Sequence, residues 1–179
     1  NGLTEITLPS SLKSIGNSTF YGCFNLTEIY YQGTMDQWLN MTFGSSWLPS
    51  NDNINLYINN ELVDEITINA DIPSYAFYGI GSITKVTLGE GVTSIGDSAF
   101  YGCRNLATVT IESEDIYIDA TGTGYNHAGY LLQYATTVRV LTSIVNTCDN
   151  SYLENTSNFT TSTSDDGKYT VFTKVQGQQ

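Results

Sequence analysis

The stretch "IGDSAFYGCRNL", Ile95 to Leu106, decides how this chain folds, because the chain contains a second version of it. The other copy is "IGNSTFYGCFNL", Ile15 to Leu26, which keeps isoleucine, phenylalanine, cysteine and leucine at the same places. Taken alone, a cysteine between an aspartate and an arginine would suggest a reactive thiol. Repetition of a whole segment is instead typical of stacked-repeat proteins, so we interpret the stretch as one structural unit.

A short alternating segment begins where each copy ends. Its versions start at residues 3, 26, 63, 83 and 106 and read "LTEITL", "LTEIYY", "VDEITI", "ITKVTL" and "LATVTI". The intervals of 23, 37, 20 and 23 residues indicate a unit of 23 residues with one irregular member. Apolar residues alternate with polar ones in the second part of each segment, which predicts a strand with one buried face.

The residues between two strands predict a tight bend. We expect a short helical turn over "NSTFYG" and another over "DSAFYG". Asn17 and Asp97 are suitable N-caps for these turns, and Gly22 and Gly102 are suitable ends.

This layout resembles the BspA-like leucine-rich repeat family of bacterial surface proteins. The residues that carry the resemblance are "LPSSLKSIGNSTFYGCFNLTEI" (8–29) and "LGEGVTSIGDSAFYGCRNLATV" (88–109), with the skeleton Ile-Gly-x-x-x-Phe-x-x-Cys-x-x-Leu. A truncated copy, "DIPSYAFYGIGSITKV" (71–86), has Ile80 where the cysteine would stand. The resemblance implies a mostly β, α/β right-handed solenoid with a parallel sheet on its concave face, short helical turns on the other side and a β-rich C-terminal cap.

We divide the chain into a repeat array over residues 1–111 and a β-rich region over 112–179. The second region is either a cap that covers the end of the solenoid or a separate small domain. It reads mainly as strands, with a hairpin signal at Asp166–Gly167. Because residues 1–3 look like the tail of an earlier unit, we expect the chain to be part of a longer protein.

Residues 32–62 form the irregular unit of the array. Thr34 and Gln37 have the spacing of a capping box, and apolar residues follow at near-helical spacing, so we expect a short amphipathic helix. A strand over 54–58, a turn at 59–60 and a return into 62–68 should follow.

The repeat predicts which side chains form the core. Phe20, Phe77 and Phe100 should stack as an aromatic ladder behind the sheet. Cys23 and Cys103 stand at equivalent places in different units, too far apart for a disulfide. Both are interpreted as small buried hydrophobes, since Ile80 replaces the cysteine in the third copy. Cys148 lies outside the repeats and is either a buried free thiol or part of an intermolecular disulfide.

The charge of the chain excludes several partners. The chain has 179 residues, six Lys and Arg, and a net charge of −12. Six basic residues cannot form a phosphate-neutralising stripe, so nucleic acid and anionic membrane surfaces are unsuitable partners. No apolar run reaches the ~20 residues that span a bilayer. No motif in the sequence indicates a cofactor or a metal ion.

The candidate ligand-binding residues are the polar positions of the repeat strands, which should face the open concave side. They are Glu5, Thr7, Glu28, Tyr30, Glu65, Thr67, Lys85, Thr87, Thr108 and Thr110. Such a ribbon of carboxylates, hydroxyls, one lysine and one tyrosine could bind a protein or a glycan. The alternative is a merely soluble sheet face, because threonine suits strands in any case.

Three further groups have both a functional and a structural interpretation. The aromatic residues Tyr30, Tyr31, Trp38 and Trp47 could stack on a sugar, although core packing of the irregular unit explains them better. The acidic residues Glu112, Glu114, Asp115 and Asp119 could hold calcium, but they lack an EF-hand spacing and suit a solvated rim. The histidine His127 lies in a glycine-rich loop without a phosphate-binding or nucleophile motif.

The resemblance implies a secreted or wall-attached protein with a non-catalytic binding or adhesion role. We therefore expect an extracellular or cell-surface module that recognises a protein or glycan of a host or neighbouring cell. A structural spacer that presents other domains is the alternative. A hydrolase is a third hypothesis, which a single histidine and the absence of a paired catalytic motif disfavour.

Overall fold

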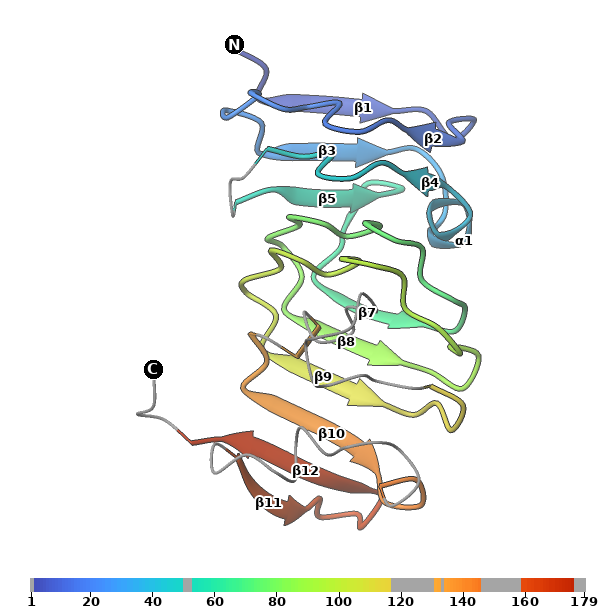
Figure 1. Cartoon of the computed structure of the whole chain (residues 1–179), viewed down its shortest axis with the longest axis vertical. Coiled ribbons are helices and arrows are strands. Elements are labelled where there is room, and N and C mark those ends of the chain that lie inside the picture. The colour runs from blue at the N-terminus through green and yellow to red at the C-terminus, as the bar shows by residue number, and fades with distance from the viewer. Residues whose placement is uncertain (1, 50–52, 117–130, 133, 146–158, 176–179) are drawn as a thin grey trace.

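The computed structural model describes residues 2–49, 53–116, 131–132, 134–145 and 159–175 of the chain. These residues form a solenoid of stacked coils in which one strand of each coil lies beside the strand of the next (Figure 1). The strands dominate, and helix among the described residues is limited to one short segment in the irregular unit and to Leu131 and Leu132. The mostly β leucine-rich repeat solenoid predicted from the repeats is confirmed.

The N-terminal sheet contains the first three coil strands in parallel order: β1 (Glu5–Leu8), β3 (Glu28–Tyr31) and β5 (Asn55–Ile58). Their apolar residues lie in register, because Ile6 pairs with Ile29 and Ile29 with Leu56. A hairpin then joins β5 to the antiparallel β6 (Glu61–Leu62). Its turn residues Asn59 and Asn60 have φ angles of 51° and 65°, the left-handed pair that a two-residue hairpin requires.

The C-terminal sheet continues the solenoid with β7 (Glu65–Ile68), β8 (Lys85–Leu88), β9 (Thr108–Ile111) and β10 (Thr137–Leu141), all parallel. The antiparallel β12 (Tyr169–Lys174) then pairs with β10, and β11 (Phe159–Thr163) pairs with β12. This hairpin lies at the end of the stack in Figure 1 and forms the β-rich cap.

The side of the coils opposite the sheet consists of short strand pairs and turns. β2 (Ser14–Ile15) pairs with β4 (Thr42–Phe43), and Ile72 bridges Ile95. The bends are turns rather than the predicted capped helices, because Ser18 and Ser98 have φ angles of 51° and 54°, which interrupt a right-handed helix. Asn17 is therefore not an N-cap: its Oδ1 accepts a 2.9 Å hydrogen bond from the Ser45 N–H of the next coil.

Asp97 likewise does not cap a helix. Its N–H donates to Ser74 Oγ at 3.0 Å, and its carbonyl accepts from the Tyr75 N–H at 2.9 Å. The two positions predicted as caps therefore join neighbouring coils.

The irregular unit contains the predicted helix, α1 (Met35–Leu39). Thr34 is its N-cap, and the capping box with Gln37 is complete: the Gln37 N–H donates to Thr34 Oγ1, and the Thr34 N–H donates to Gln37 Oε1. The helix buries Trp38 and Leu39 and leaves Asp36 in its first turn.

This unit also contains a full repeat coil that the sequence analysis missed. The Phe20 N–H donates to the Trp47 carbonyl at 2.9 Å, so the bend at 44–49 stacks on the bend of the first coil. Ser46 has a φ of 49°, the same left-handed conformation as Ser18. β5 is therefore a repeat strand, although its segment scarcely resembles the other copies in sequence.

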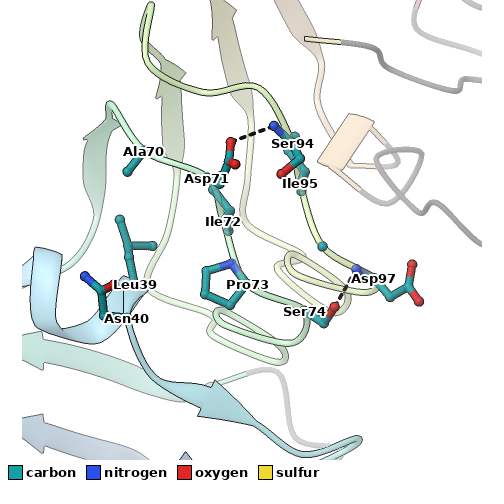
Figure 2. A pocket seen from close by; sticks show the side chains of 11 residues that line it. Leu39, Asn40, Ala70, Asp71, Ile72, Pro73, Ser74, Ser94, Ile95 and Asp97 are labelled. Atoms are coloured by element: carbon teal, nitrogen blue, oxygen red, sulfur yellow. Dashed lines mark hydrogen bonds between the residues drawn. The ribbon is translucent and has the colours of Figure 1, made fainter. Parts of the chain in front are cut away.

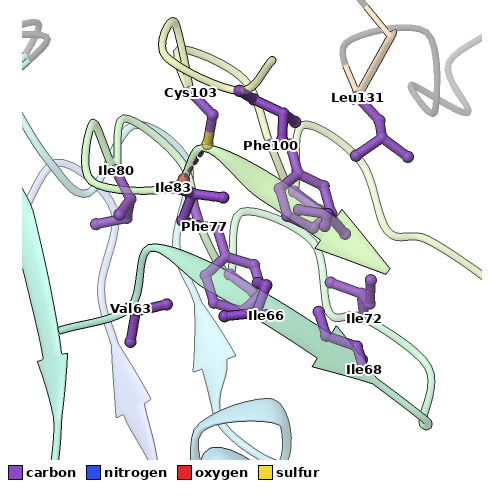
Figure 3. Packing of buried hydrophobic residues seen from close by; sticks show 14 of the residues in the cluster. Val63, Ile66, Ile68, Ile72, Phe77, Ile80, Ile83, Phe100, Cys103 and Leu131 are labelled. Carbon is purple, nitrogen blue, oxygen red and sulfur yellow. Dashed lines mark hydrogen bonds between the residues drawn. The ribbon is translucent and has the colours of Figure 1, made fainter. Parts of the chain in front are cut away.

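The core is a continuous cluster of buried aliphatic and aromatic side chains between the sheet and the bends. Figure 3 shows the rings of Phe77 and Phe100 stacked, with centroids 5.2 Å apart, as the predicted ladder requires. Phe20 does not join this ladder, because it is half-buried and packs edge-on against Trp47 at 6.2 Å. The tryptophan of the unrecognised coil separates it from Phe77.

The cysteine of the quoted stretch is structural. Cys103 is fully buried, and its thiol donates to the Phe77 carbonyl at 3.1 Å (Figure 3). Burial raises the pKa of the thiol, so it stays protonated. Cys103 and the half-buried Cys23 are both free thiols, as predicted. Cys148 lies outside the described residues.

The two sheets meet at a seam between β5 and β7, where the described strands do not form a ladder. Trp38 Nε1 donates to the Ala76 carbonyl at 3.2 Å, and Trp47 Nε1 donates to the Tyr75 carbonyl at 2.9 Å. On the strand side, Ser82 Oγ donates to the Val63 carbonyl at 2.7 Å. These side-chain donors supplement the backbone contact at Ile54, which bridges Ile80 and accepts from the Gly81 and Ser82 N–H groups.

Candidate binding face

The outward side chains of the parallel strands form two columns, which we call the sheet face. The first column runs Glu5, Glu28 and Asn55 on the N-terminal sheet and Glu65, Lys85, Thr108 and Thr137 on the C-terminal sheet. The second runs Thr7, Tyr30 and Tyr57, then Thr67, Thr87, Thr110 and Arg139. The structure thus aligns the ten predicted residues on one face, and it adds Asn55, Tyr57, Thr137 and Arg139.

Thr110 was predicted to be exposed on this face, but the structure buries it. Its exposed fraction is 6%, whereas Thr7 and Thr67 on the same column are exposed. Thr110 lies in register beside Arg139, and Tyr169 of the cap hairpin lines the same hollow. The cap therefore covers this end of the column, which the repeats alone could not indicate.

Aromatic and acidic side chains gather on the N-terminal part of the face. The rings of Tyr30 and Tyr57 stack with centroids 4.7 Å apart and an interplanar angle of 16°. The Tyr30 hydroxyl donates to the Glu28 carboxylate. This hydrogen bond, followed by desolvation and the carboxylate charge, raises the pKa of Tyr30 to about 12. Tyr30 is therefore neutral at physiological pH and acts as a hydrogen-bond donor.

A hollow of about 380 Å³ lies on the C-terminal part of the face, and we call it the cap hollow. Its lining is Lys85, Thr87, Thr108, Thr110, Glu112, Arg139 and Tyr169. Four of these residues were predicted from the repeats. Glu112, Arg139 and Tyr169 were not, because they come from the end of β9, from β10 and from the cap, where the repeat pattern fades.

Tyr169 organises the charges of the cap hollow. The Arg139 guanidinium lies over its ring at 4.6 Å, and Lys168 Nζ lies 4.9 Å from the ring centroid. The Tyr169 hydroxyl donates to the Glu112 carboxylate, which also receives Lys168 Nζ at 3.2 Å. These partners, the tyrosine foremost, lower the pKa of Glu112 and keep it ionised.

A second and larger hollow, of about 690 Å³, lies away from the sheet face, beside the end of α1 (Figure 2). The Asp71 carboxylate, which points toward Ser94, accepts from the Thr93 N–H, the Thr93 hydroxyl and the Ser94 N–H at 2.8, 2.9 and 2.8 Å. These hydrogen bonds lower the pKa of Asp71. Because the carboxylate already joins two coils, this hollow is a less suitable ligand site than the cap hollow.

The other predicted candidates divide between core and surface. Tyr31, Trp38 and Trp47 are buried, so only Tyr30 of the aromatic group lies on the sheet face. Glu114 and Asp115 are exposed.

Two absences concern the described part of the chain alone. It contains no group of three His, Cys, Asp or Glu side chains placed to hold a metal ion. None of its helices is long and apolar enough to cross a membrane. Asp119 and His127, considered for calcium binding and catalysis, lie outside the described residues.

Comparison with known proteins agrees with the architecture. A family model of the BspA type leucine-rich repeat region matches residues 1–66 and 70–122, in six copies. The match includes residues of the irregular unit, in line with the extra coil that β4 and β5 form. Neither a curated protein nor a solved structure shows significant similarity to the chain.

Proposed function

The chain belongs to the BspA-type leucine-rich repeat family, and from this premise we propose that it is a non-catalytic binding module. Its ligand is a protein or a glycan on the surface of a host or neighbouring cell, and the sheet face makes the contact. The module acts outside the cell or at the cell surface.

The observation that carries this proposal is the aligned polar face that each sheet presents. Each repeat strand buries its alternate apolar residues and turns its polar ones outward, so polar side chains lie in register along both sheets. Stacked Tyr30 and Tyr57 present a flat aromatic area, and aromatic residues are the commonest anchors of binding surfaces. The cap hollow adds a concave site at the other end.

A structural spacer is the second candidate, and one observation favours it. Charged groups on the face satisfy each other, since Glu28 accepts from Tyr30, Lys85 pairs with Glu65 at 3.2 Å, and Glu112 accepts from Lys168. A face that pairs its own charges needs no ligand. A hydrolase has no comparable support, because the sequence offers a single histidine, His127, and no paired catalytic motif.

The test uses a pair of identical substitutions on opposite sides. Tyr57→Ser removes the aromatic area of the sheet face, and Tyr21→Ser changes a tyrosine that is 77% exposed on the bends. The native protein is screened against immobilised matrix proteins and a glycan array, and the variants are measured on each positive ligand. We expect Tyr57→Ser to weaken binding about tenfold or more and Tyr21→Ser to leave it unchanged.

Two results would contradict the proposal. Equal binding by the native protein and the Tyr57→Ser variant would remove the sheet face as the contact surface. A screen without any ligand, with the native protein folded by circular dichroism, would favour the spacer.

A further inference from the structure

We propose that the cap hollow binds the carboxylate of an acidic sugar, such as a uronic or sialic acid residue, with Arg139 as the main contact. This inference rests on the proposed function, because it names the ligand class of one part of the sheet face. The hollow is lined by polar side chains from β8, β9, β10 and the cap.

Arg139 is the first observation. Its guanidinium stacks on the Tyr169 ring at 4.6 Å, but it makes no hydrogen bond or ion pair with any described residue. An arginine side chain has five N–H donors in a planar fork that matches a carboxylate. Stacking holds the fork in place while no described residue takes its donors, so the side chain is ordered in advance for an anion.

Thr110 is the second and independent observation. Its exposed fraction is 6%, it lines the hollow, and its hydroxyl has no hydrogen-bond partner among the described residues. Ser82 and Ser113, the other buried polar residues in the described part of the chain, both donate to backbone carbonyls. A buried hydroxyl without a hydrogen-bond partner lowers the stability of the folded protein. A ligand that enters the hollow and pairs with this hydroxyl would remove that unfavourable free energy.

Basic side chains gather at the hollow, although the chain carries a net charge of −12. Lys85, Arg139 and Lys168, three of the six basic residues, lie in or beside the hollow. Glu65 pairs with Lys85, and Glu112 takes Lys168 and the Tyr169 hydroxyl. After the hydrogen bonds of Glu112 and Asp166, the charge of Arg139 also lowers the pKa of both carboxylates, but Arg139 forms no ion pair with a carboxylate of the described residues.

The lining favours a sugar over an acidic peptide. Thr87, Thr108 and Thr110 present hydroxyls that can both donate and accept, as sugar hydroxyls do. An acidic peptide could also reach Arg139 with a side-chain carboxylate, but a sugar acid offers a carboxylate and several hydroxyls on one small ring. The lining also includes no aliphatic side chain, and cations already cover the Tyr169 ring. An apolar side chain of a peptide would therefore find no apolar surface to pack against.

The experiment titrates the whole chain with sodium glucuronate and with N-acetylneuraminate, followed by amide and side-chain NMR shifts. Glucose is the neutral control, and an acetylated tri-glutamate amide represents an acidic peptide. We expect both acidic sugars to shift residues of β9 and β10, with glucose causing no change. Higher salt should weaken the binding because the contact is ionic.

Matched variants locate the contact. Arg139→Gln and Lys13→Gln remove the same charge, but Lys13 is exposed and outside the lining of the hollow. We expect Arg139→Gln to weaken glucuronate binding about tenfold or more and Lys13→Gln to leave it within about twofold. Thr110→Val should weaken binding while the thermal midpoint stays equal or rises, since it removes a buried hydroxyl that pairs with no described residue.

Each opposite outcome overturns the proposal. Equal shifts with glucose, or equal loss with Lys13→Gln, would exclude a specific carboxylate site. Stronger binding of the tri-glutamate peptide would identify a peptide site instead. If the acidic sugars do not bind but Tyr57→Ser still abolishes surface binding, the ligand class is wrong and the binding function stands.

Discussion

Neighbouring coils are joined in one way at the seam and in another way at the regular contact between β8 and β9. Between β8 and β9 the backbones pair over four residues in register, and the similar bends at 72–79 and 95–102 stack behind them. At the seam the ladder stops, and the indole N–H groups of Trp38 and Trp47 donate to backbone carbonyls of the next coil. The hydrophobic core nevertheless runs through both places.

The difference shows which parts of a repeat are needed for stacking. A solenoid coil must bury its apolar row and satisfy its backbone groups, because one unit cannot do either alone. Regular coils meet both needs with backbone pairing and close glycine contacts. The irregular unit pairs its backbone with the first coils in the same way, but toward the next coil it has only the backbone bonds at Ile54 and adds large side chains that carry a donor.

The largest expected effect concerns the regular half. Phe100→Ala should lower the free energy of unfolding by about 3–5 kcal/mol, because the ring is buried against Phe77 and leaves a cavity. Phe20→Ala is the matched control in the first coil, where the ring is half-buried beside Trp47 and should cost less. Urea denaturation measures both values, and equal values would mean that the two stacks are equivalent.

Close approach of the backbones is tested by a second pair. A Cβ at Gly96 would lie 2.2 Å from the Ser74 backbone nitrogen, whereas at the equivalent Gly16 the nearest atom is Thr19 Oγ1 at 3.5 Å. Gly96→Ala should therefore cost about 1–3 kcal/mol through overpacking. Gly16→Ala should leave the stability unchanged or raise it. A neutral Gly96→Ala would show that the coils can separate without loss.

The seam itself is tested with Trp38→Phe. The substitution leaves the buried Ala76 carbonyl without its donor, which should cost about 1–3 kcal/mol. Trp47→Phe removes a bond that is only partly buried and should cost less. If the indoles couple the two sheets, unfolding of Trp38→Phe followed by tryptophan fluorescence and by circular dichroism should no longer coincide. Coincident transitions would show that the core and the other hydrogen bonds at the seam couple the halves without the Trp38 indole.

Prediction from the sequence succeeds where the same residue pattern occurs in more than one copy of the repeat. Ile15, Phe100, Cys103 and Leu106 could be assigned to their environments because each has a counterpart in another copy. Prediction fails at the bends, because a polar segment that begins with a possible N-cap and ends with glycine is typical of a short helix. The left-handed φ of Ser18 and Ser98 is set by stacking on the next coil, a contact that the segment itself does not encode.

The site was predictable only for the columns that repeat. Glu28, Lys85 and Thr108 follow from the alternation of their strands, whereas Tyr57 lies in the coil whose copy went unrecognised. The signal that could have found it is "FGSSW" at 43–47, which aligns with "IGNST" at 15–19. Arg139 and Tyr169 come together through the pairing of β10 with β12, which depends on contacts distant in sequence.

The smallest expected effect concerns a contact between two regular coils, and it depends on pH. Hydrogen bonds from Thr93 and Ser94 lower the pKa of Asp71 in the folded protein. The ionised carboxylate therefore stabilises the fold fully above its ordinary pKa of about 4, and this contribution is lost as the pH falls through the lowered value. Native protein should accordingly lose stability in acid.

Asp71→Asn should lower the stability slightly at pH 7 and remove this part of the acid loss, because the variant has no carboxylate to protonate. Glu90→Gln is the control, since Glu90 is exposed and makes no hydrogen bond with the described residues. Urea midpoints at pH 3 and pH 7 provide the measurement. If Asp71→Asn and Glu90→Gln change the pH dependence equally, the inter-coil hydrogen bonds do not stabilise the stack, and backbone pairing with glycine contacts would be sufficient to explain the regular half.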